Sequence, residues 1–367
     1  MTKINYRFAT LSVIWFGLSV RFSMLTALLL IGLANVASAG DISLGSASDF
    51  TVLELGEKAL SINSNSLIYG NVGKKKGGDK FLMSSSTITG QVYGDSNLSL
   101  DVSNSGGTNV NTGDTATKIA GDPGVNTSGK FSSKDTYHNP TYDPFVKMDM
   151  STAVSDVLAA SSAAAAKTAN HTYSNGLSLT SGATQTINGV GGGTVVDIRG
   201  GKFEIDGSGS VLTLHGGDAN DYFIINYRSS DDFKITSGGA INLTGGLTAS
   251  EVLWNIVKSG SKIELTGNKG KTPDAPIIGT FLAADRGFNI SSVETIPHGP
   301  PYERFIEGAI YGGGDGEGIN ITQSIIKHAP FIQPIPEPTS LALALLGVVG
   351  WGLCRRRKAY FATNDDS

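Results

Sequence analysis

The chain has 367 residues, a formal net charge of −4, 48 glycines and a single cysteine. The N-terminal leader contributes three positive charges and the C-terminal tail contributes one, so the body between them carries about −8. An acidic body argues against nucleic acid or anionic lipid as a partner, because both favour a positive surface. The sole cysteine, Cys354, lies in the tail, so the body has no disulfide and no thiolate chemistry. Many glycines and only 8% aromatic residues indicate a turn-rich, all-β protein rather than an enzyme with a pocket.

Residues 1–39 have the composition of a secretory signal peptide. Three basic residues precede an apolar run over 24–33, and the run is followed by Ala37-Ser38-Ala39. Small residues at Ala37 and Ala39 suit signal peptidase, which we expect to cleave before Gly40. Translation from either of the first two methionines fits this pattern, and the leader is left out of the reasoning on the fold.

A short repeat opens the body. The pattern S-x-I-x-G-x-V occurs at 66–72 and again at 86–92, and its centre returns at 306–310. Apolar residues at every second position predict strands with one buried face, and the twenty-residue offset is about one coil of a β-solenoid. We therefore expect Ile68 to stack on Ile88 and Val72 on Val92, with the glycines at close-packed sites. The repeat positions are Ile68, Gly70, Val72, Ile88, Gly90, Val92, Ile306, Gly308 and Ile310. The distant third copy predicts that the coils are not filled in chain order.

An alanine-rich stretch over 147–170 predicts one long helix with Ser151 as its N-cap. Its small-residue stripe buries little area, so the helix must lie close against another surface. Alternating strands separated by Gly, Ser, Asn and Asp turns are predicted after it, at 177–179, 195–198, 203–205, 211–214, 222–227, 233–235 and 241–243. Trp254 lies in the apolar run 252–256, where we expect it to be buried rather than available for stacking on sugar.

Four later segments give the body a family resemblance. They are V-L-W-N-I at 252–256, G-T-F-L-A-A at 279–284, E-G at 307–308 and H-A-P-F at 328–331. Together with the early repeat and the helix they resemble the choice-of-anchor A domain of bacterial surface proteins. The body is also distantly similar to bacterial ice-binding proteins. These resemblances imply a discontinuous β-solenoid flanked by one long helix.

The C-terminal segment has the features of a protein-sorting signal. A proline-rich linker over 332–338 contains Pro336-Glu337-Pro338, and we expect it to be extended and exposed. A hydrophobic span and basic cluster occupy 339–358, and the tail covers 359–367. A short apolar stretch followed by Arg355, Arg356 and Arg357 forms a stop-transfer element whose positive end stays cytoplasmic. The arrangement resembles the PEP-CTERM signal of Gram-negative bacteria. This implies a hydrophobic C-terminal helix, transient membrane association, and processing by exosortase.

Other chemistry has weaker support in the sequence. The five histidines lack zinc spacing, and the Gly-Asp loops at 216–221 and 312–318 match no established calcium motif, so both are interpreted as turns. Lysines 74–76 and Lys80 are interpreted as a solvated loop tip, with a contact to acidic polysaccharide as the alternative. Carboxylates lie among the predicted strands at Asp197, Glu204, Asp206, Asp231 and Asp232. A glycosidase needs two of them to converge on one cleft, which the sequence does not reveal.

The sequence thus predicts a mainly β protein: a discontinuous right-handed β-solenoid over 40–331 with one long flanking alanine-rich helix, plus an N-terminal signal helix and a C-terminal hydrophobic helix. We expect a non-enzymatic structural or adhesion protein of the cell surface or extracellular matrix, exported by a Gram-negative bacterium through an inner-membrane intermediate. Signal peptidase and exosortase are the expected processing partners, and exopolysaccharide is a candidate ligand. No cofactor, metal or catalytic residue is predicted. The alternatives are a carbohydrate-active β-helix enzyme, which needs paired carboxylates, and an ice- or surface-binding module, which needs an exposed threonine array. Thr87 and Thr89 form one T-x-T without a counterpart at Leu67 and Tyr69.

Overall fold

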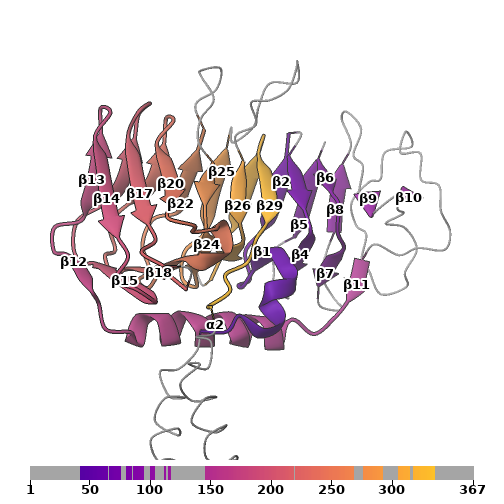
Figure 1. Cartoon of the computed structure of the whole chain (residues 1–367). Helices are drawn as coiled ribbons and strands as arrows, with labels where there is room; N and C mark the ends of the chain where they lie inside the picture. Colours follow the sequence, from indigo (N-terminus) through magenta and orange to yellow (C-terminus); the bar gives the residue numbers. More distant parts are fainter. Residues whose placement is uncertain are drawn as a thin grey trace, which may run out of the picture. The chain divides into compact units, whose positions relative to one another are not determined.

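The backbone winds into coils of three strands, and each coil places one strand on each of three sides (Figure 1). The computed structural model describes residues 42–64, 66–75, 80–84, 86–94, 100–103, 111–112, 115–116, 145–218, 220–267, 276–291, 305–314 and 317–334. The expected signal-peptidase site, the Pro-Glu-Pro motif, the basic cluster and the two terminal helices lie outside these residues. The coils belong to one compact unit that begins at Ser43.

The first side, sheet A, has ten parallel strands. In spatial order they are β11 (Phe145–Lys147), β7 (Val92–Gly94), β4 (Asn71–Lys74), β1 (Phe50–Glu54), β27 (Ile310–Gly312), β24 (Thr280–Ala283), β21 (Val252–Ile256), β18 (Tyr222–Tyr227), β15 (Gly193–Ile198) and β12 (His171–Tyr173). The 3₁₀ turns η1 (Gly45–Asp49) and η2 (Ala249–Glu251) lead into β1 and β21.

The second side, sheet B, has nine parallel strands. They are β13 (Leu177–Thr180), β16 (Phe203–Asp206), β19 (Phe233–Thr236), β22 (Ile263–Thr266), β25 (Phe288–Ser291), β28 (Ile319–Thr322), β2 (Leu60–Asn63), β5 (Phe81–Ser84) and β8 (Leu100–Ser103).

The third side, called side C, consists of two shorter parallel sheets. One contains β14 (Thr184–Asn188), β17 (Val211–His215) and β20 (Ala240–Thr244). The other contains β23 (Ile277–Ile278), β26 (Ile306–Gly308), β29 (Ile325–His328), β3 (Leu67–Tyr69) and β6 (Thr87–Ile88). A separate antiparallel pair joins β9 (Asn111–Thr112) to β10 (Thr115–Ala116).

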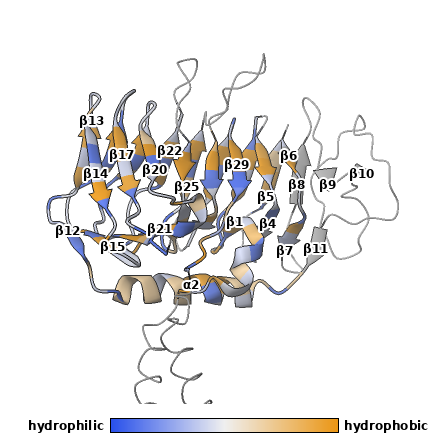
Figure 2. Ribbon diagram, viewed as in Figure 1, coloured by the Kyte–Doolittle hydropathy of each residue, from blue (hydrophilic) through white to orange (hydrophobic). Residues whose placement is uncertain are grey.

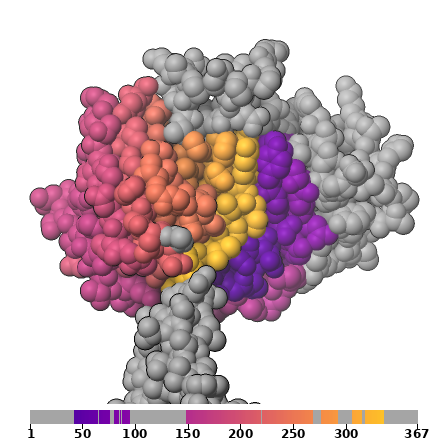
Figure 3. Space-filling view, in the orientation of Figure 1, coloured from indigo at the N-terminus to yellow at the C-terminus, as the bar shows by residue number. Residues whose placement is uncertain are grey.

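The coils are out of chain order, as the distant repeat copy predicted. The final coil, β27 to β29, pairs with the first coil on all three sides, through β27–β1, β28–β2 and β29–β3. In Figure 3 the yellow C-terminal coil lies between the orange and indigo coils. A long helix after β11 returns the chain to the far end, from which the later coils build back toward the first.

The repeat forms the turn from side C into sheet A. The register pairs Ile68 with Ile88 on side C and Val72 with Val92 on sheet A, as the twenty-residue offset predicts. The glycine between them sits at the bend: Gly70 has φ +115°, and a Cβ on Gly90 would collide with the backbone of Gly70.

Two more coils use the same bend. Ile306, Gly308 and Ile310 occupy equivalent places in β26, the bend and β27, and a Cβ on Gly308 would collide with the carbonyl of Gly279. Gly279 marks a further copy, over 277–281, that the sequence analysis missed because its third apolar residue is Phe281.

Coil length differs between the two parts of the solenoid. Val72 pairs with Val92, an offset of 20 residues, whereas Val195 pairs with Ile224, an offset of 29. The longer coils carry strands that the sequence analysis did not assign, including β12, β14, β22, β25 and β28. None of these strands is longer than five residues, so each offers few alternating positions to recognise.

The helix α2 (Ser151–Ala166) is shorter than the predicted 147–170 and lies along sheet A (Figure 1). Ser151 is not its N-cap: Met150 holds that position, and the Asp149 carboxylate accepts the Ser151 N–H at 2.8 Å. The buried side of α2 is lined by Ala153, Val154, Val157, Ala160 and Ala164. These small side chains let the helix approach sheet A closely, which answers where the alanine stripe packs.

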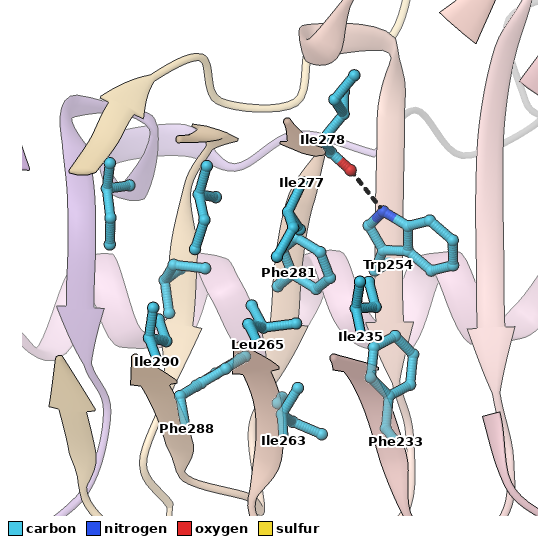
Figure 4. Packing of buried hydrophobic residues seen from close by; sticks show 14 of the residues in the cluster. Phe233, Ile235, Trp254, Ile263, Leu265, Ile277, Ile278, Phe281, Phe288 and Ile290 are labelled. Atoms are coloured by element: carbon cyan, nitrogen blue, oxygen red, sulfur yellow. Dashed lines mark hydrogen bonds between the residues drawn. The ribbon is translucent and has the colours of Figure 1, made fainter. Parts of the chain in front are cut away.

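Aliphatic and aromatic ladders fill the interior. Along β16, β19 and β22 of sheet B the apolar residues point inward and the polar residues outward, an alternation that Figure 2 shows as changing colour along the strands. Trp254 is fully buried, stacks on Phe281 with ring centroids 5.8 Å apart, and donates its indole N–H to the Ile278 carbonyl at 2.9 Å (Figure 4). Trp254 is therefore a core residue, as expected, and unavailable to a sugar.

Candidate binding face on sheet B

The outer side of sheet B presents two regular rows of side chains, called the sheet-B face. Each strand contributes two outward residues, because successive side chains of a strand point to opposite sides. The first row is Ser178, Glu204, Lys234, Glu264, Asn289, Asn320, Ser61 and Leu82. The second is Thr180, Asp206, Thr236, Thr266, Ser291, Thr322, Asn63 and Ser84. Neighbouring strands in such a sheet lie about 4.8 Å apart, so each row repeats at about that spacing.

The second row consists mostly of hydroxyls, called the hydroxyl row. Thr236 Oγ1 donates to Asp206 Oδ1 at 2.6 Å, and this bond lowers the pKa of Asp206. Ser84 Oγ donates to Asn63 Oδ1 at 2.9 Å. Hydrogen bonds across strands hold these side chains in place, so the face presents ordered donors and acceptors.

The first row divides into a charged half and a neutral half. Lys234 Nζ lies 3.0 Å from Asp232 and 3.6 Å from Glu264, and Lys202 lies 2.6 Å from Glu204. The hydrogen bond to Asp232 raises the pKa of Lys234 and lowers that of Asp232. From β25 onward the row is uncharged, beginning with Asn289 and Asn320. Exposed ion pairs of this kind stabilise little, so the charged half contributes mainly hydration and pairing specificity.

Sequence reasoning missed this face. It looked for T-x-T within one strand, whereas the hydroxyl row takes one residue from each coil. Thr87 lies in β6 on side C, away from sheet B, and Thr89 Oγ1 accepts the Gly70 N–H at 3.0 Å. A usable signal was present: four-residue strings of apolar, polar, apolar and hydroxyl character recur as LSLT, FKIT, IELT, FNIS and INIT.

A buried ion pair joins the first two coils at the bend from sheet A to sheet B. Lys74 Nζ lies 2.8 Å from Glu54 Oε2, and both side chains are fully buried. Lys74 is therefore not part of a solvated loop tip, which corrects the interpretation of the lysine cluster. Burial raises the pKa of Glu54 to about 7, although Lys74 and the Gly56 N–H oppose the shift.

Arg286 performs a similar task farther along the same bend. Its guanidinium is buried and donates to the carbonyls of Lys258, Asp231 and Ser229 at 2.6–2.8 Å. It also lies 5.5 Å from the centre of the Tyr227 ring. Burial lowers the pKa of Arg286. The residue binds the turns of neighbouring coils together, so we assign it a structural role.

The carboxylates considered for catalysis are divided among different parts of the fold. Asp197 lies on sheet A, where burial opposes its ionisation but Arg199 and Arg228, at 2.8 and 2.9 Å, together lower its pKa. Glu204 and Asp206 lie on the sheet-B face, and Asp231 and Asp232 lie in the turn before β19. Glu204 pairs with Lys202, Asp206 with Thr236 and Asp232 with Lys234, so each of these carboxylates has a partner that is not a second carboxylate.

Within the described residues, no cluster of three or more His, Cys, Asp or Glu side chains is arranged to hold a metal ion. The loop at 312–318 lies partly outside those residues. In the other glycine–aspartate loop the Asp221 carboxylate accepts the backbone N–H groups of Gly217 and Asp218, as in a self-capped turn. Among the helices of the described part of the chain, none has the length and apolar character to cross a membrane.

Comparison with known proteins identifies the C-terminal segment. Residues 334–358 match the PEP-CTERM protein-sorting motif. The chain therefore carries the sorting signal of an exported protein that exosortase processes and that associates with the surface of a Gram-negative bacterium. No curated protein matches the chain.

Several solved structures are similar to the body. One is an ice-binding protein from the Antarctic ascomycete Antarctomyces psychrotrophicus, with 17% identity, a TM-score of 0.42, and coverage of 78% of this chain and 98% of that one. An ice-binding protein from an Antarctic biological consortium has 16% identity, a TM-score of 0.42, and coverage of 78% of this chain and 90% of that one. The ice-binding protein LeIBP from an Arctic yeast has 18% identity, a TM-score of 0.41, and coverage of 81% of this chain and 97% of that one. At these identities and scores the likeness assigns no ligand.

Proposed function

We propose that the mature protein is a non-enzymatic surface protein that holds a hydroxyl-rich polymer, such as exopolysaccharide, along the sheet-B face. In this proposal the leader ends at residue 39, the solenoid body spans 40–331, and the signal at 332–358 delivers the body to the outside of the cell. The observation that carries the proposal is the sheet-B face, where two rows of hydroxyl, amide and carboxylate groups run across eight strands, from β13 to β5. α2 covers sheet A, so among the described residues sheet B is the longest sheet whose outer side no helix covers.

A periodic face suits a periodic polymer. Each hydrogen bond to a sugar hydroxyl contributes only about 0.5–1.5 kcal/mol in net terms. Repetition along one polymer raises the overall affinity, because later contacts form intramolecularly. Aromatic residues are absent from the described outward positions of sheet B, so binding depends on these polar contacts.

The test compares the exported protein with a variant of its neutral half, Asn289→Ala, Asn320→Ala and Thr322→Val. Binding to purified exopolysaccharide of the host is measured by biolayer interferometry. We expect binding to weaken by roughly tenfold or more, since three contacts of about 0.5–1.5 kcal/mol are removed. The matched control changes three polar residues on the exposed side of α2, Thr152→Val, Ser155→Ala and Ser162→Ala. Equal binding by both variants would contradict the proposal.

The hydroxyl row favours a second candidate, a module that binds ice or another ordered surface. The hydroxyl row places Thr236, Thr266, Ser291 and Thr322 on four successive strands, as an ordered lattice requires. Lys234 and Glu264 in the adjacent row are strongly hydrated, which opposes the release of water from a contact surface. Thermal hysteresis measured on the exported protein decides this candidate: activity that Thr266→Val abolishes supports it, and the absence of hysteresis excludes it.

A further inference from the structure

After its last strand, β29, the chain stays in contact with the solenoid for several residues. Residues 329–333, called the C-terminal strap, run back across the coils. The Ala329 N–H donates to the Gly308 carbonyl at 3.0 Å, and the Ile332 N–H donates to the Ser250 carbonyl at 2.7 Å. The Gln333 side chain donates to the Tyr222 hydroxyl at 3.1 Å. Phe331 between them is only 3% exposed, and its ring makes an edge contact with Tyr222 at 6.1 Å.

All of these contacts lie at one bend of the solenoid. Gly308 ends β26 on side C, Ser250 belongs to η2 between β20 and β21, and Tyr222 begins β18 on sheet A. The strap therefore follows the bend between side C and sheet A, from the coil of β27 past those of β24 and β21 to that of β18. Three steps between coils cover about 14 Å, and the five residues from Ala329 to Gln333, joined by four Cα–Cα steps, span at most about 14 Å. The last contact joins the Gln333 and Tyr222 side chains, which add their own length to this reach.

The strap controls where the sorting motif can be. Pro336 follows Gln333 by three residues, and three residues of fully extended chain span at most about 11 Å. The sequence analysis predicted an extended, exposed linker from Ile332 onward. Ile332 is 62% exposed, yet its backbone is bound to the solenoid and the next side chain is anchored. Two residues therefore separate Pro336 from Gln333, whose side chain is anchored at a defined place on the body.

The sheet-B face lies opposite that place. Each coil passes from sheet A to sheet B to side C and back to sheet A, so the bend between side C and sheet A is the one that sheet B does not touch. A body held at this bend presents sheet B on its far side. The helix α2 and sheet A border this bend, so they would lie nearer than sheet B to the surface anchor that holds the C-terminal segment.

We infer that the strap mounts the body on its surface anchor at the bend between side C and sheet A, so that the sheet-B face points away from the cell. This inference builds on the proposed function, because it gives the proposed binding face its direction. It requires only contacts within the described residues and the known number of residues to the sorting motif.

The test measures the accessibility of two faces on intact cells. Cys354 is the only cysteine of the chain, so a Cys354→Ser background accepts single probes at Thr236→Cys on sheet B and Leu158→Cys on the exposed side of α2. Both are expressed as the full chain in an exosortase-bearing host and treated with a bulky maleimide. Each rate is divided by the rate for the same protein released and purified. We expect the α2 probe to react several-fold more slowly than the sheet-B probe on cells, and equal normalised rates would overturn the inference.

A strap-release variant, Phe331→Ala with Gln333→Ala, supplies the second arm. We expect it to raise the α2 rate toward the sheet-B rate, whereas the matched control Ile332→Ala, which removes only an exposed side chain, keeps the difference. Hydrogen exchange at the Ile332 amide shows whether the strap has been released, since its protection depends on the bond to Ser250. A difference that persists after that protection is lost would also overturn the inference.

Both labelling arms use an exosortase-bearing host that makes no exopolysaccharide, so polymer bound to the sheet-B face does not shield the Thr236→Cys probe. A protein that labels asymmetrically but does not bind exopolysaccharide contradicts the proposed function alone. A protein that binds but labels equally on both faces contradicts the mounting alone.

Discussion

Sheet A and sheet B are built from the same coils, yet their sequences look different. Strands of sheet A such as β18 and β21 are buried almost throughout, whereas β16 and β19 of sheet B alternate between buried and partly exposed residues. The difference comes from α2, which covers the outer side of sheet A. A parallel sheet covered on both sides reads as a continuous apolar run, and one covered on a single side alternates.

The polar residues of the two sheets also have different tasks. On sheet A, Asn226 and Asn255 are fully buried and donate to the α2 carbonyls of Ala164 and Ser161 at 2.9 and 3.0 Å. On sheet B, Asn289 and Asn320 lie in the outward row. The same residue type therefore fastens the helix on one side and remains available to a ligand on the other. The comparison teaches that outward position has functional meaning only where no other element covers it.

The largest expected effect tests whether the two sheets are equivalent on their inner sides. Trp254→Ala on sheet A and Phe233→Ala on sheet B should each lower the free energy of unfolding by about 3–5 kcal/mol, because each leaves a cavity in the shared core. Both side chains are fully buried. Urea unfolding of the purified body measures both. A loss below about 1 kcal/mol for either one would show that the core is not continuous between the sheets.

The next effect concerns pH and the bend where sheet A passes into sheet B. The pKa of Glu54 is raised from 4.5 to about 7 in the folded protein, so the folded state binds more protons than the unfolded state between these values. Stability from this group is therefore full below about pH 4.5 and falls as pH rises to about 7, by no more than about 3 kcal/mol. The Glu54→Gln variant lacks this pH-dependent component of the free energy of unfolding. The difference in unfolding free energy between the wild type and this variant should decline over that range, and a rise would show that the ion pair with Lys74 dominates.

The two asparagine sites provide a direct comparison of the outer sides. Asn255→Ala removes the bond to the Ser161 carbonyl and leaves buried polar groups unpaired, which should cost about 1–3 kcal/mol. Asn289→Ala on sheet B should change stability by no more than about 0.5 kcal/mol, as surface substitutions usually do. Thermal unfolding of both variants measures the contrast. Equal losses would mean that the sheet-B face is covered by part of the chain outside the described residues.

The smallest effect uses a pair of threonines. Thr51 on sheet A is fully buried, donates to the Tyr69 carbonyl at 2.8 Å and lies 3.0 Å from His328 Nδ1. Thr51→Val should cost about 1 kcal/mol, the net value of a buried hydrogen bond. Thr236→Val on sheet B should cost less, because water replaces the bond to Asp206. If both variants unfold at the same denaturant concentration, the hydrogen bonds of Thr51, including its contact with His328 of the last coil, contribute nothing measurable to stability.

Much of the fold could be read from local pattern. The pattern of Ile68, Gly70 and Val72 predicted a coil, because alternation and a glycine at a bend are properties of a few neighbouring residues. The alanine-rich helix and the sorting motif were also recognisable, since composition and order within a short segment define them. The short strands β22, β25 and β28 escaped prediction, because four residues with two apolar positions resemble many turns.

The candidate site shows the same division. Thr236, Thr266 and Thr322 are separated by about 30 and 56 residues in the chain, and only the register of the coils places them in one row. Lys74 was misjudged for a similar reason. Its neighbours in sequence are lysines and glycines, but its partner Glu54 belongs to the previous coil.

The sequence by itself determined the C-terminal sorting signal, the coil as the repeating unit, the helix and the absence of disulfides from the body, because each depends on residues close together in the chain or on composition. The tertiary structure decided the order of the coils, the burial of Lys74, the face that α2 covers and the path of the strap over 329–333. These depend on contacts between residues 20 to about 280 positions apart. Backbone pairing between coils, rather than any local preference, sets which side chains meet, and so only the assembled solenoid reveals the sheet-B face.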